Sequence, residues 1–405
     1  MTMPDAPIGI DLHEAERVAA TAARLLPTSL APSFAARFAR SDRLFDEYVS
    51  RLTLEVVRET KMHEALREWS TAAEVVTRAG LDSRCALVPV EWMLRRLAER
   101  GVIEVQDAPG AGRFRATHPI DVLAAADVRE AQQRHDPTAL PSYTLAETAA
   151  RAYPAFLAGT KSGEDLLLAP ARLALWNSYF ANDHTLYAVN NRVGAVALAA
   201  WLGGGAHTIL ELGAGMGSGT AAAVDALKTT DRLGDVETYR VTDIVPTFLR
   251  YAERRVREES LPTPSVTFGA LDMNRPFAGQ AVPPETVTVV YAVNTLHVAH
   301  DLAMTLGEIR QALRPDGHLI IAECVRPRAG QTLYPEFVFN MLATFRAPRL
   351  HPTYRPNGGF LTPEQWRAAL AEAGFVDVRM LPDIAAIRDA LPHFSVAAIG
   401  ATRRS

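Results

Sequence analysis

The feature that most constrains the fold is a glycine-rich loop between a short apolar run and an alanine-rich stretch. The run Thr208–Leu212 leads directly into Gly213-Ala214-Gly215-Met216-Gly217-Ser218-Gly219-Thr220, and the stretch Ala221–Leu227 follows. A strand, a glycine loop and a helix in this order let a ligand approach the backbone and meet the helix N-terminus. The pattern predicts the first strand and helix of a doubly wound α/β sheet.

The rest of the C-terminal half carries the pattern of such a sheet. From about residue 160 onward, β-branched apolar runs alternate with helical periodicity, which is typical of a mainly parallel sheet covered by helices. We predict further strands at residues 239–242, 266–270, 286–290 and 319–322. Residues 161–405 are therefore expected to form a Rossmann-like α/β domain.

Acidic residues around the loop indicate which ligand it binds. Glu211 lies just before the loop, where a carboxylate suits the sulfonium and amine of S-adenosylmethionine better than a diphosphate. Asp243 ends the second strand, where an acid can accept hydrogen bonds from ribose hydroxyls. After the third strand, Asp272 is placed for the adenine amino group and Met273 for the adenine ring. The full predicted cofactor set is Glu211, Gly213, Ala214, Gly215, Gly217, Asp243, Ile244, Asp272, Met273 and Asn294.

A histidine and a glutamate follow the next two strands. His297 comes shortly after the predicted strand 286–290, and Glu323 ends the predicted strand 319–322. Ligands of such sheets lie at the carboxyl ends of the strands, so both side chains are expected at one cleft. A carboxylate fixes the tautomer of the imidazole, and the imidazole can then remove a proton from a nucleophile. The alternative is a buried histidine held by backbone groups.

These motifs resemble a known family. The segments Glu211–Thr220, Thr242–Ile244, Asn294–His297 and Arg314–Glu323 resemble the C-methyltransferase domains of polyketide synthases, which are class I S-adenosylmethionine-dependent methyltransferases. The resemblance spans roughly residues 172–403. It implies that His297 is the base that deprotonates the α-carbon of a β-ketoacyl thioester, that Glu323 orients it, and that S-adenosylhomocysteine is the product.

The N-terminal region follows a different pattern. Residues 1–35 are expected to be a tail with a short helix at 12–26, and helical periodicity runs from Phe34 to Glu68. Two helices at 71–78 and 87–100 and a hairpin of strands 102–105 and 113–117, joined by a turn at 108–112, then predict a winged-helix-like unit. Connecting helices are expected at 121–135 and 145–159.

This unit resembles the N-terminal region of small-molecule O-methyltransferases, which dimerise through it. Residues 36–160 are therefore expected to be a mainly helical dimerisation domain, which makes a homodimer the expected state. The same resemblance leaves the methylated atom open, because those enzymes also use a histidine and a glutamate. DNA binding through Arg84, Arg95, Arg96, Arg113 and Arg115 is the less favoured interpretation, since acidic residues alternate with them.

Aromatic residues before the first strand and after the fifth are the candidates for a substrate pocket. The predicted set is Trp176, Tyr179, Phe180, Tyr187, Asn191, Phe337, Asn340 and Met341. The loop 352–360 could close over the substrate. A metal site at His297 and His300 is possible by spacing, but no third ligand is evident, so no metal is expected.

Composition narrows the partners and the compartment. The formal net charge is −4, which gives no overall attraction to nucleic acid or an anionic membrane. The most apolar stretch, 193–202, is about half the length of a membrane span, and residues 1–10 do not read as a signal peptide. Two distant cysteines, Cys85 and Cys324, fit a reducing cytoplasm.

The expected function is C-methylation of a polyketide-like acyl substrate, free or tethered to a carrier protein. O-methylation is the alternative, and a DNA-binding, cofactor-sensing regulator is a weaker one.

Overall fold

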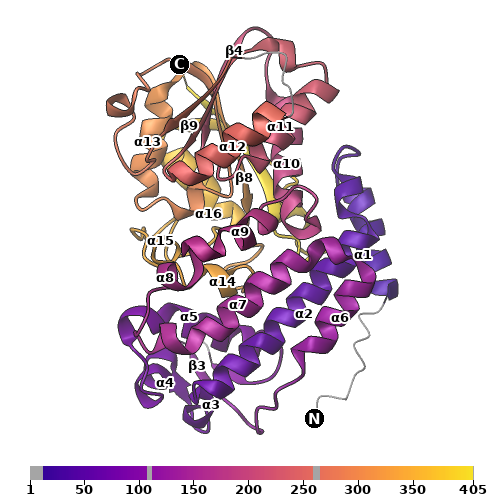
Figure 1. Ribbon diagram of the computed structural model, residues 1–405, viewed down its shortest axis with the longest axis vertical. Coiled ribbons are helices and arrows are strands. Elements are labelled where there is room, and N and C mark those ends of the chain that lie inside the picture. Colours follow the sequence, from indigo (N-terminus) through magenta and orange to yellow (C-terminus); the bar gives the residue numbers. More distant parts are fainter. Residues whose placement is uncertain (1–11, 107–111, 259–264, 405) are drawn as a thin grey trace.

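The chain forms a sheet-containing part built on a mainly helical part, as the computed structural model shows (Figure 1). The structure describes residues 12–106, 112–258 and 265–404. Of the predicted turn at 108–112, only Gly112 is among these residues. The segment 1–10, which the sequence does not predict to be a signal peptide, lies outside them.

A seven-stranded sheet is the centre of the C-terminal part, and its order is β6-β5-β4-β7-β8-β10-β9. The strands β4 to β8 pair in parallel, whereas β10 runs antiparallel to both β8 and β9. Their bounds are β4 His207–Leu212, β5 Val236–Asp243, β6 Ser265–Ala270, β7 Val287–Val293, β8 Leu313–Cys324, β9 Phe375–Leu381 and β10 Val396–Arg403. The strands predicted from apolar runs are all present and mostly longer.

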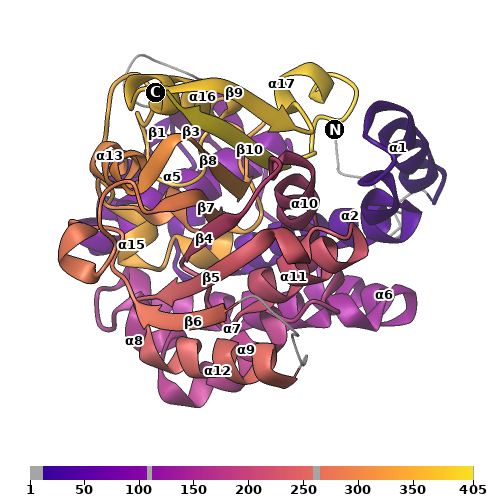
Figure 2. The same cartoon turned by 90° about the horizontal axis from the view of Figure 1, so that it is seen from above.

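Helices cover both faces of this sheet. Figure 2 shows α10, α11 and α12 on one face and α13 and α16 on the other. The helices of this part are α9 Leu173–Tyr179, α10 Thr185–Trp201, α11 Ser218–Thr229, α12 Pro246–Glu258, α13 Leu302–Ala312, α14 Glu336–Phe339, α15 Ala343–Arg346, α16 Pro363–Glu372 and α17 Ile384–Ile387. The predicted Rossmann-like architecture is therefore confirmed.

The N-terminal part contains eight helices and a small sheet among its described residues. The helices are α1 Leu12–Leu25, α2 Ala36–Glu59, α3 Met62–Ala65, α4 Ala72–Arg78, α5 Ser83–Glu99, α6 Ala125–His135, α7 Leu140–Leu157 and α8 Gly163–Leu167. The sheet contains β1 Ser70–Thr71, β3 Arg113–Arg115 and β2 Glu104–Gln106 in that order. The predicted sequence of two helices and a hairpin is present, with one additional strand. The winged-helix assignment and the domain boundaries stay predictions.

The helix expected over residues 34–68 is shorter in the structure. It ends at Glu59, and Lys61 adopts the left-handed conformation with φ 59° before α3 begins. The hydroxyl of Thr60 donates to the carbonyl of Val56 at 2.6 Å, and the backbone N–H of Thr60 donates to the same carbonyl. Apolar periodicity continues through this break because α2 and α3 bury their apolar faces in one core, so the pattern alone does not locate the break.

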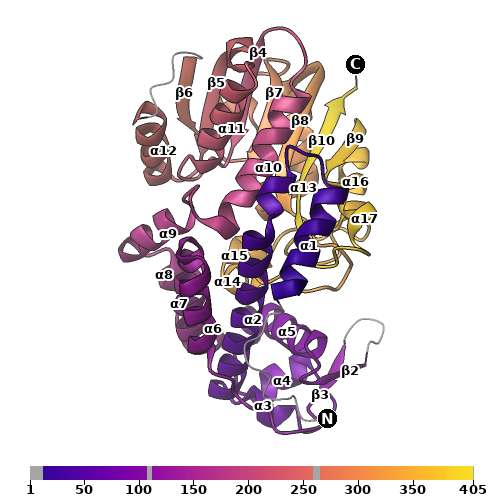
Figure 3. The same ribbon diagram turned by 90° about the vertical axis from the view of Figure 1, so that its right-hand side faces the viewer.

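The segment 12–35 is not a tail. Ala22, Leu26, Leu30 and Phe34 are buried in the core of the sheet-containing part, and the rings of Phe34 and Phe394 lie 4.4 Å apart. Figure 3 shows α1 next to the first half of α2, and Glu14 of α1 forms an ion pair with Arg43 of α2. The segment 12–35 therefore packs both on the sheet-containing part and on α2.

The second hydrophobic core lies within the helical part and extends beyond it. It contains buried residues from Leu44 to Leu167, together with Trp176, Leu186, Met216, Phe337, Val338 and Met341. The segment after β8 thus packs on the N-terminal helices. Among the helices that the structure describes, none has the length and apolarity needed to cross a membrane.

Candidate active site

The glycine loop joins β4 to α11 and bends through three left-handed glycines. Gly213, Gly215 and Gly217 have φ values of 61°, 56° and 80°. A Cβ atom at Gly215 would meet no atom within 4 Å, so this backbone faces open space in which a ligand can lie. A Cβ atom at Gly217 would lie 2.8 Å from the Cα atom of Ala252. Gly217, which the sequence placed among the cofactor residues, is instead buried against α12 and is not among the residues that line the cavity described below.

Two carboxyl groups hold this loop in shape. The carboxyl of Glu211 is 1% exposed and accepts a hydrogen bond of 2.8 Å from Thr220 in α11. Burial, with a smaller contribution from Asp243, raises the pKa of Glu211 to about 7. Asp243 accepts the backbone N–H of Gly215 at 2.9 Å and that of Val245 at 2.7 Å, and burial also raises its pKa.

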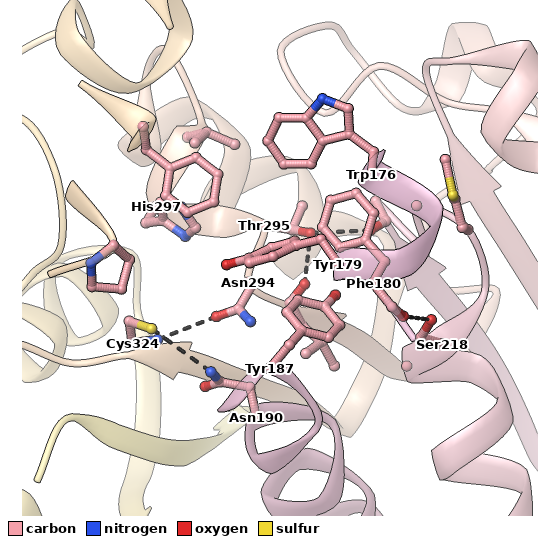
Figure 4. Close-up of a pocket in the computed structure, with 18 of the residues that line it drawn as sticks. Trp176, Tyr179, Phe180, Tyr187, Asn190, Ser218, Asn294, Thr295, His297 and Cys324 are labelled. Atoms are coloured by element: carbon pink, nitrogen blue, oxygen red, sulfur yellow. Dashed lines mark hydrogen bonds between the residues drawn. The ribbon is translucent and has the colours of Figure 1, made fainter. Parts of the chain in front are cut away.

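A cavity of about 430 Å³ opens where the glycine loop, the ends of β7 and β8, and the segment after β8 meet. Figure 4 shows side chains from α9, α10, α11, β8 and the turn after β7 converging on it. The predicted cofactor residues that line it are Glu211, Gly213, Ala214, Gly215, Asp243, Ile244, Asp272, Met273 and Asn294. Ile244 is 61% exposed, which places it at the rim of the cavity.

The structure brings His297 and Glu323 together. The Nδ1 atom of His297 lies 2.6 Å from the Oε2 atom of Glu323, which is fully buried. The Oε1 atom of Glu323 accepts the backbone N–H groups of Thr295, Leu296 and His297 at 3.1, 2.9 and 3.3 Å. One carboxylate therefore holds both the ring and the turn that carries it. With Nδ1 bound to Glu323, Nε2 is the ring nitrogen left for a substrate.

The turn that carries His297 has a second support, which the sequence did not indicate. Arg355 is 1% exposed and donates to the backbone carbonyls of His297 and Ala299. The rings of Phe345 and Phe360 pack on the imidazole, with centroids 5.7 and 4.7 Å away. Arg355 lies in the loop that was expected to close over a substrate, so this loop also anchors the site.

Five of the residues predicted for a substrate pocket line this cavity, and their role stays a prediction. They are Trp176, Tyr179, Phe180 and Tyr187, which Figure 4 shows, and Asn191.

The segment after β8 forms two short helices, α14 and α15. The prediction that Phe337, Asn340 and Met341 line the cavity is wrong. Phe337 and Met341 are fully buried in the core of the helical part, and Asn340 is 3% exposed. None of these three is among the lining residues; Val338, Phe339 and Leu342 take that position. Phe337 in α14 and Met341 in the turn just after it both pack toward the N-terminal helices.

Several lining residues were not predicted. Asn190, Cys324 and Tyr334 line the cavity, although the sequence motifs assign no role to them. A signal for Asn190 exists in the sequence, because Asn190 and Asn191 are adjacent amides in a mostly apolar helix.

The metal interpretation of His300 gains no support. The backbone N–H of His300 donates to the Oδ1 atom of Asn274 at 2.7 Å, and the neighbouring Asp301 forms an ion pair with Arg349. Within residues 12–106, 112–258 and 265–404, no three His, Cys, Asp or Glu side chains are grouped so as to hold a metal ion.

Comparison with known proteins agrees with this geometry. Residues 210–319 match a protein-family model described as a methyltransferase domain. The methyltransferase calH of Penicillium decumbens is 33% identical over 167 residues, which cover 41% of this chain and 43% of that protein. Bacterial and fungal polyketide synthases also match, in one case over 5% of the synthase. The chain thus spans less than half the length of these relatives.

Solved structures share the fold over nearly the whole chain. The CurJ carbon methyltransferase superposes with a TM-score of 0.75 at 21% identity, over 97% of this chain and 99% of that one. The trans-methyltransferase CalH, solved in complex with SAH, superposes with a TM-score of 0.60 at 20% identity, over 90% and 91%. The sheet order and the glycine loop are those of a class I, Rossmann-like methyltransferase fold, and residues 210–319 within it match the methyltransferase domain model.

Proposed function

We propose that this chain is an S-adenosylmethionine-dependent methyltransferase that methylates an enolisable carbon of a polyketide-like acyl substrate. The observation that carries the proposal is the His297–Glu323 pair on the wall of the cavity that also contains the glycine loop. A base and a cofactor loop on one cavity are what methyl transfer to a neutral nucleophile requires.

The residues of the loop fit the cofactor. The open space at Gly215 admits a ligand against the backbone, and Asp243, although it already accepts two N–H groups, retains lone pairs for ribose hydroxyls. Ile244 and Met273 provide apolar surface for the adenine ring, and Asp272 provides an acceptor for its amino group. S-adenosylmethionine, when bound, supplies an electrophilic methyl group on a sulfonium.

His297 is suited to remove a proton in a site with little water. The imidazole is 5% exposed and is packed between Phe345 and Phe360. Its Nδ1–H donates to Glu323, so Nε2 carries the lone pair that accepts the proton. The resulting imidazolium is stabilised by the buried carboxylate, whose other oxygen stays fixed by three backbone N–H groups.

A carbon acceptor is favoured over a hydroxyl by the relatives. The relatives include polyketide synthases, and the structure with the TM-score of 0.75 is named a carbon methyltransferase. The same His–Glu pair could equally deprotonate a hydroxyl, so O-methylation is the outcome that the experiment below must separate. We propose that the acyl group is free or bound to a carrier protein, and that the chain works as a homodimer.

DNA binding is not favoured by the structure. The five arginines that would contact phosphates are all within 4 Å of acidic side chains of the same chain. Arg96 in particular is buried and forms an ion pair with Asp46. A phosphate-binding surface needs free cations, which these residues do not provide.

The decisive experiment uses S-adenosylmethionine carrying carbon-13 on its methyl group. The enzyme is incubated with a β-ketoacyl N-acetylcysteamine thioester, and the product is analysed by NMR. A new aliphatic methyl signal supports the proposal, and a methoxy signal would assign O-methylation instead. His297→Ala should abolish transfer while cofactor affinity, measured by calorimetry, stays unchanged. Loss of cofactor binding in this variant would contradict the assignment of His297 as the base.

A further inference from the structure

Two buried amides on the cavity wall, those of Asn190 and Asn191, have an Oδ1 atom without a hydrogen-bond partner among the described residues. The Nδ2 atom of Asn191 donates to Asn182 at 2.8 Å, so Asn190 is the less satisfied of the two. Asn190 in α10 is 5% exposed and lines the cavity. Its Oδ1 atom has no hydrogen-bond partner among the described residues, and its Nδ2 atom is 3.7 Å from the Sγ atom of Cys324 (Figure 4). Buried polar atoms are normally hydrogen-bonded, and a sulfur atom is a weak acceptor. The amide therefore has hydrogen-bonding capacity left for a ligand.

The neighbouring thiol decides which end of the amide is available. Burial, followed by the charge of Glu323, raises the pKa of Cys324 to about 12, so the sulfur keeps its proton. A thiol is a weak donor, and the amide offers its proton an acceptor if the amide turns by 180° about its last torsion. The S–H group then donates to Oδ1, and the NH₂ group faces the cavity. The oxygen and nitrogen of an amide have nearly the same size, so the turn needs no extra space.

The amide is connected to the catalytic pair through short stretches of backbone. Cys324 directly follows Glu323 at the end of β8, and its N–H donates to Oδ1 of Asn294 at 3.3 Å. Asn294 comes three residues before His297. Tyr179 and Tyr187 line the same cavity, and burial raises the pKa of both phenols, so they stay neutral. The part of the cavity next to Asn190, Tyr179 and Tyr187 therefore offers neutral hydrogen-bond donors, and no Lys or Arg is among the described residues that line the cavity.

We propose that the side-chain NH₂ of Asn190 donates a hydrogen bond to the carbonyl oxygen of the acyl substrate and stabilises the enolate that forms there. This inference rests on the proposed function. His297 removes the α-proton, the C–H electron pair moves into the enolate, and its negative charge develops on the oxygen that Asn190 holds. The enolate carbon then forms its bond to the methyl group as the sulfonium C–S bond breaks, and the proton stays on Nε2 of His297.

The test replaces Asn190 by residues of matched shape. Asn190→Asp keeps the shape but offers no donor when ionised, Asn190→Ala removes the group, and Asn190→Ser restores a small donor. Arg192→Ala, an exposed position on the same helix, is the control. For each variant we would measure kcat and KM with a β-ketoacyl N-acetylcysteamine thioester, the cofactor Kd and the Tm. Removing one donor of this kind typically lowers kcat about 10²–10³-fold.

The expected result is a kcat loss of that size in Asn190→Asp and Asn190→Ala, with partial recovery in Asn190→Ser and unchanged cofactor Kd. The ratio of the Asn190→Asp kcat to the wild-type kcat should rise as the pH falls, because a protonated carboxyl is a donor, and the ratio removes the loss that protonation of His297 causes in both proteins. A structural role would instead change the Tm and the cofactor Kd together with kcat. If the wild type methylates carbon and the kcat of Asn190→Asp is within threefold of the wild-type value, this inference is overturned and the proposed function stands. Absence of carbon methylation by the wild type would overturn the proposed function and this inference together.

Discussion

Replacement of Glu323 by glutamine tests how the site activates its histidine. Glutamine has the shape of glutamate, so its carbonyl oxygen can take the place of Oε1 and keep the N–H groups of Thr295, Leu296 and His297. Its NH₂ group then takes the place of Oε2 and donates to Nδ1 of the imidazole. The histidine is forced into the tautomer in which Nε2 carries the proton, and it can no longer accept one from the substrate.

The size of the effect can be worked from these contacts. A change of tautomer in a comparable histidine–carboxylate pair lowers kcat about 10⁴-fold, and we expect Glu323→Gln to lower kcat about 10³–10⁴-fold. Stability should fall by only about 1–3 kcal/mol, since one charge-assisted hydrogen bond is replaced. Glu323→Ala is different, because it leaves three buried N–H groups without an acceptor at about 1–3 kcal/mol each. That sum approaches the whole stability of a typical domain, about 5–15 kcal/mol.

The assay is single-turnover methyl transfer with labelled cofactor, together with thermal unfolding of wild type and both variants. Nitrogen-15 NMR of the imidazole would report the tautomer directly. Glu323→Gln should fold, bind cofactor and show the reversed tautomer with almost no transfer. A variant that shows the reversed tautomer and still transfers methyl groups within tenfold of the wild-type rate would refute the reasoning, because His297 would then not be the base.

Three further predictions concern the glycine loop. Burial raises the pKa of Glu211 to about 7 from its ordinary 4.5, so folding without cofactor binds a proton there, and stability is full below pH 4.5 and falls as the pH rises through 7. At pH 8.5, Glu211→Gln should therefore be more stable than wild type by about 3 kcal/mol and should unfold at a higher temperature. At pH 4 the two proteins should have the same stability. Gly217→Ala should cost about 2–4 kcal/mol by chemical denaturation, because its Cβ would press on Ala252, whereas Gly215→Ala should cost less and mainly weaken cofactor binding. Asp243→Asn should raise the cofactor Kd about tenfold or more in calorimetry, and an unchanged Kd would remove its assigned ribose role.

Much of the C-terminal fold could be predicted because its signals are local. Each parallel strand is buried on both faces and reads as an apolar run, and each leads into a turn whose residues the fold places at one edge of the sheet. The proximity of His297 and Glu323 follows from this rule alone, since β7 and β8 are neighbours in the sheet. The 2.6 Å contact and the three backbone donors depend on details of the turn after β7 that no pattern records.

The failures come from contacts between segments far apart in the chain. Phe337 and Met341 share a helical face with ordinary apolar character, and nothing in the local sequence says which side of the cavity that face meets. Phe34 and its neighbours read as a proline-bounded tail because their partner, Phe394, lies at the other end of the chain. Arg355 belongs to no recognisable motif, and arginine is normally an exposed residue. Nothing in the sequence therefore indicates that it is buried and supports the turn of His297.

The position of the cavity between the two cores explains why one segment can serve both parts. The segment after β8 contributes Val338 and Phe339 to the cavity, while Tyr334 donates to Asp42 at 2.8 Å and Glu336 accepts from Trp92 at 2.9 Å. Glu336 is also paired with Arg326, which follows β8 on the sheet side. The helical part therefore holds the wall opposite the glycine loop, and the shape of the substrate space depends on how that part packs on the sheet. A substitution such as Trp92→Phe, remote from any reacting atom, should consequently change KM for the acyl substrate more than the cofactor Kd, and equal changes in both would contradict this division of the cavity.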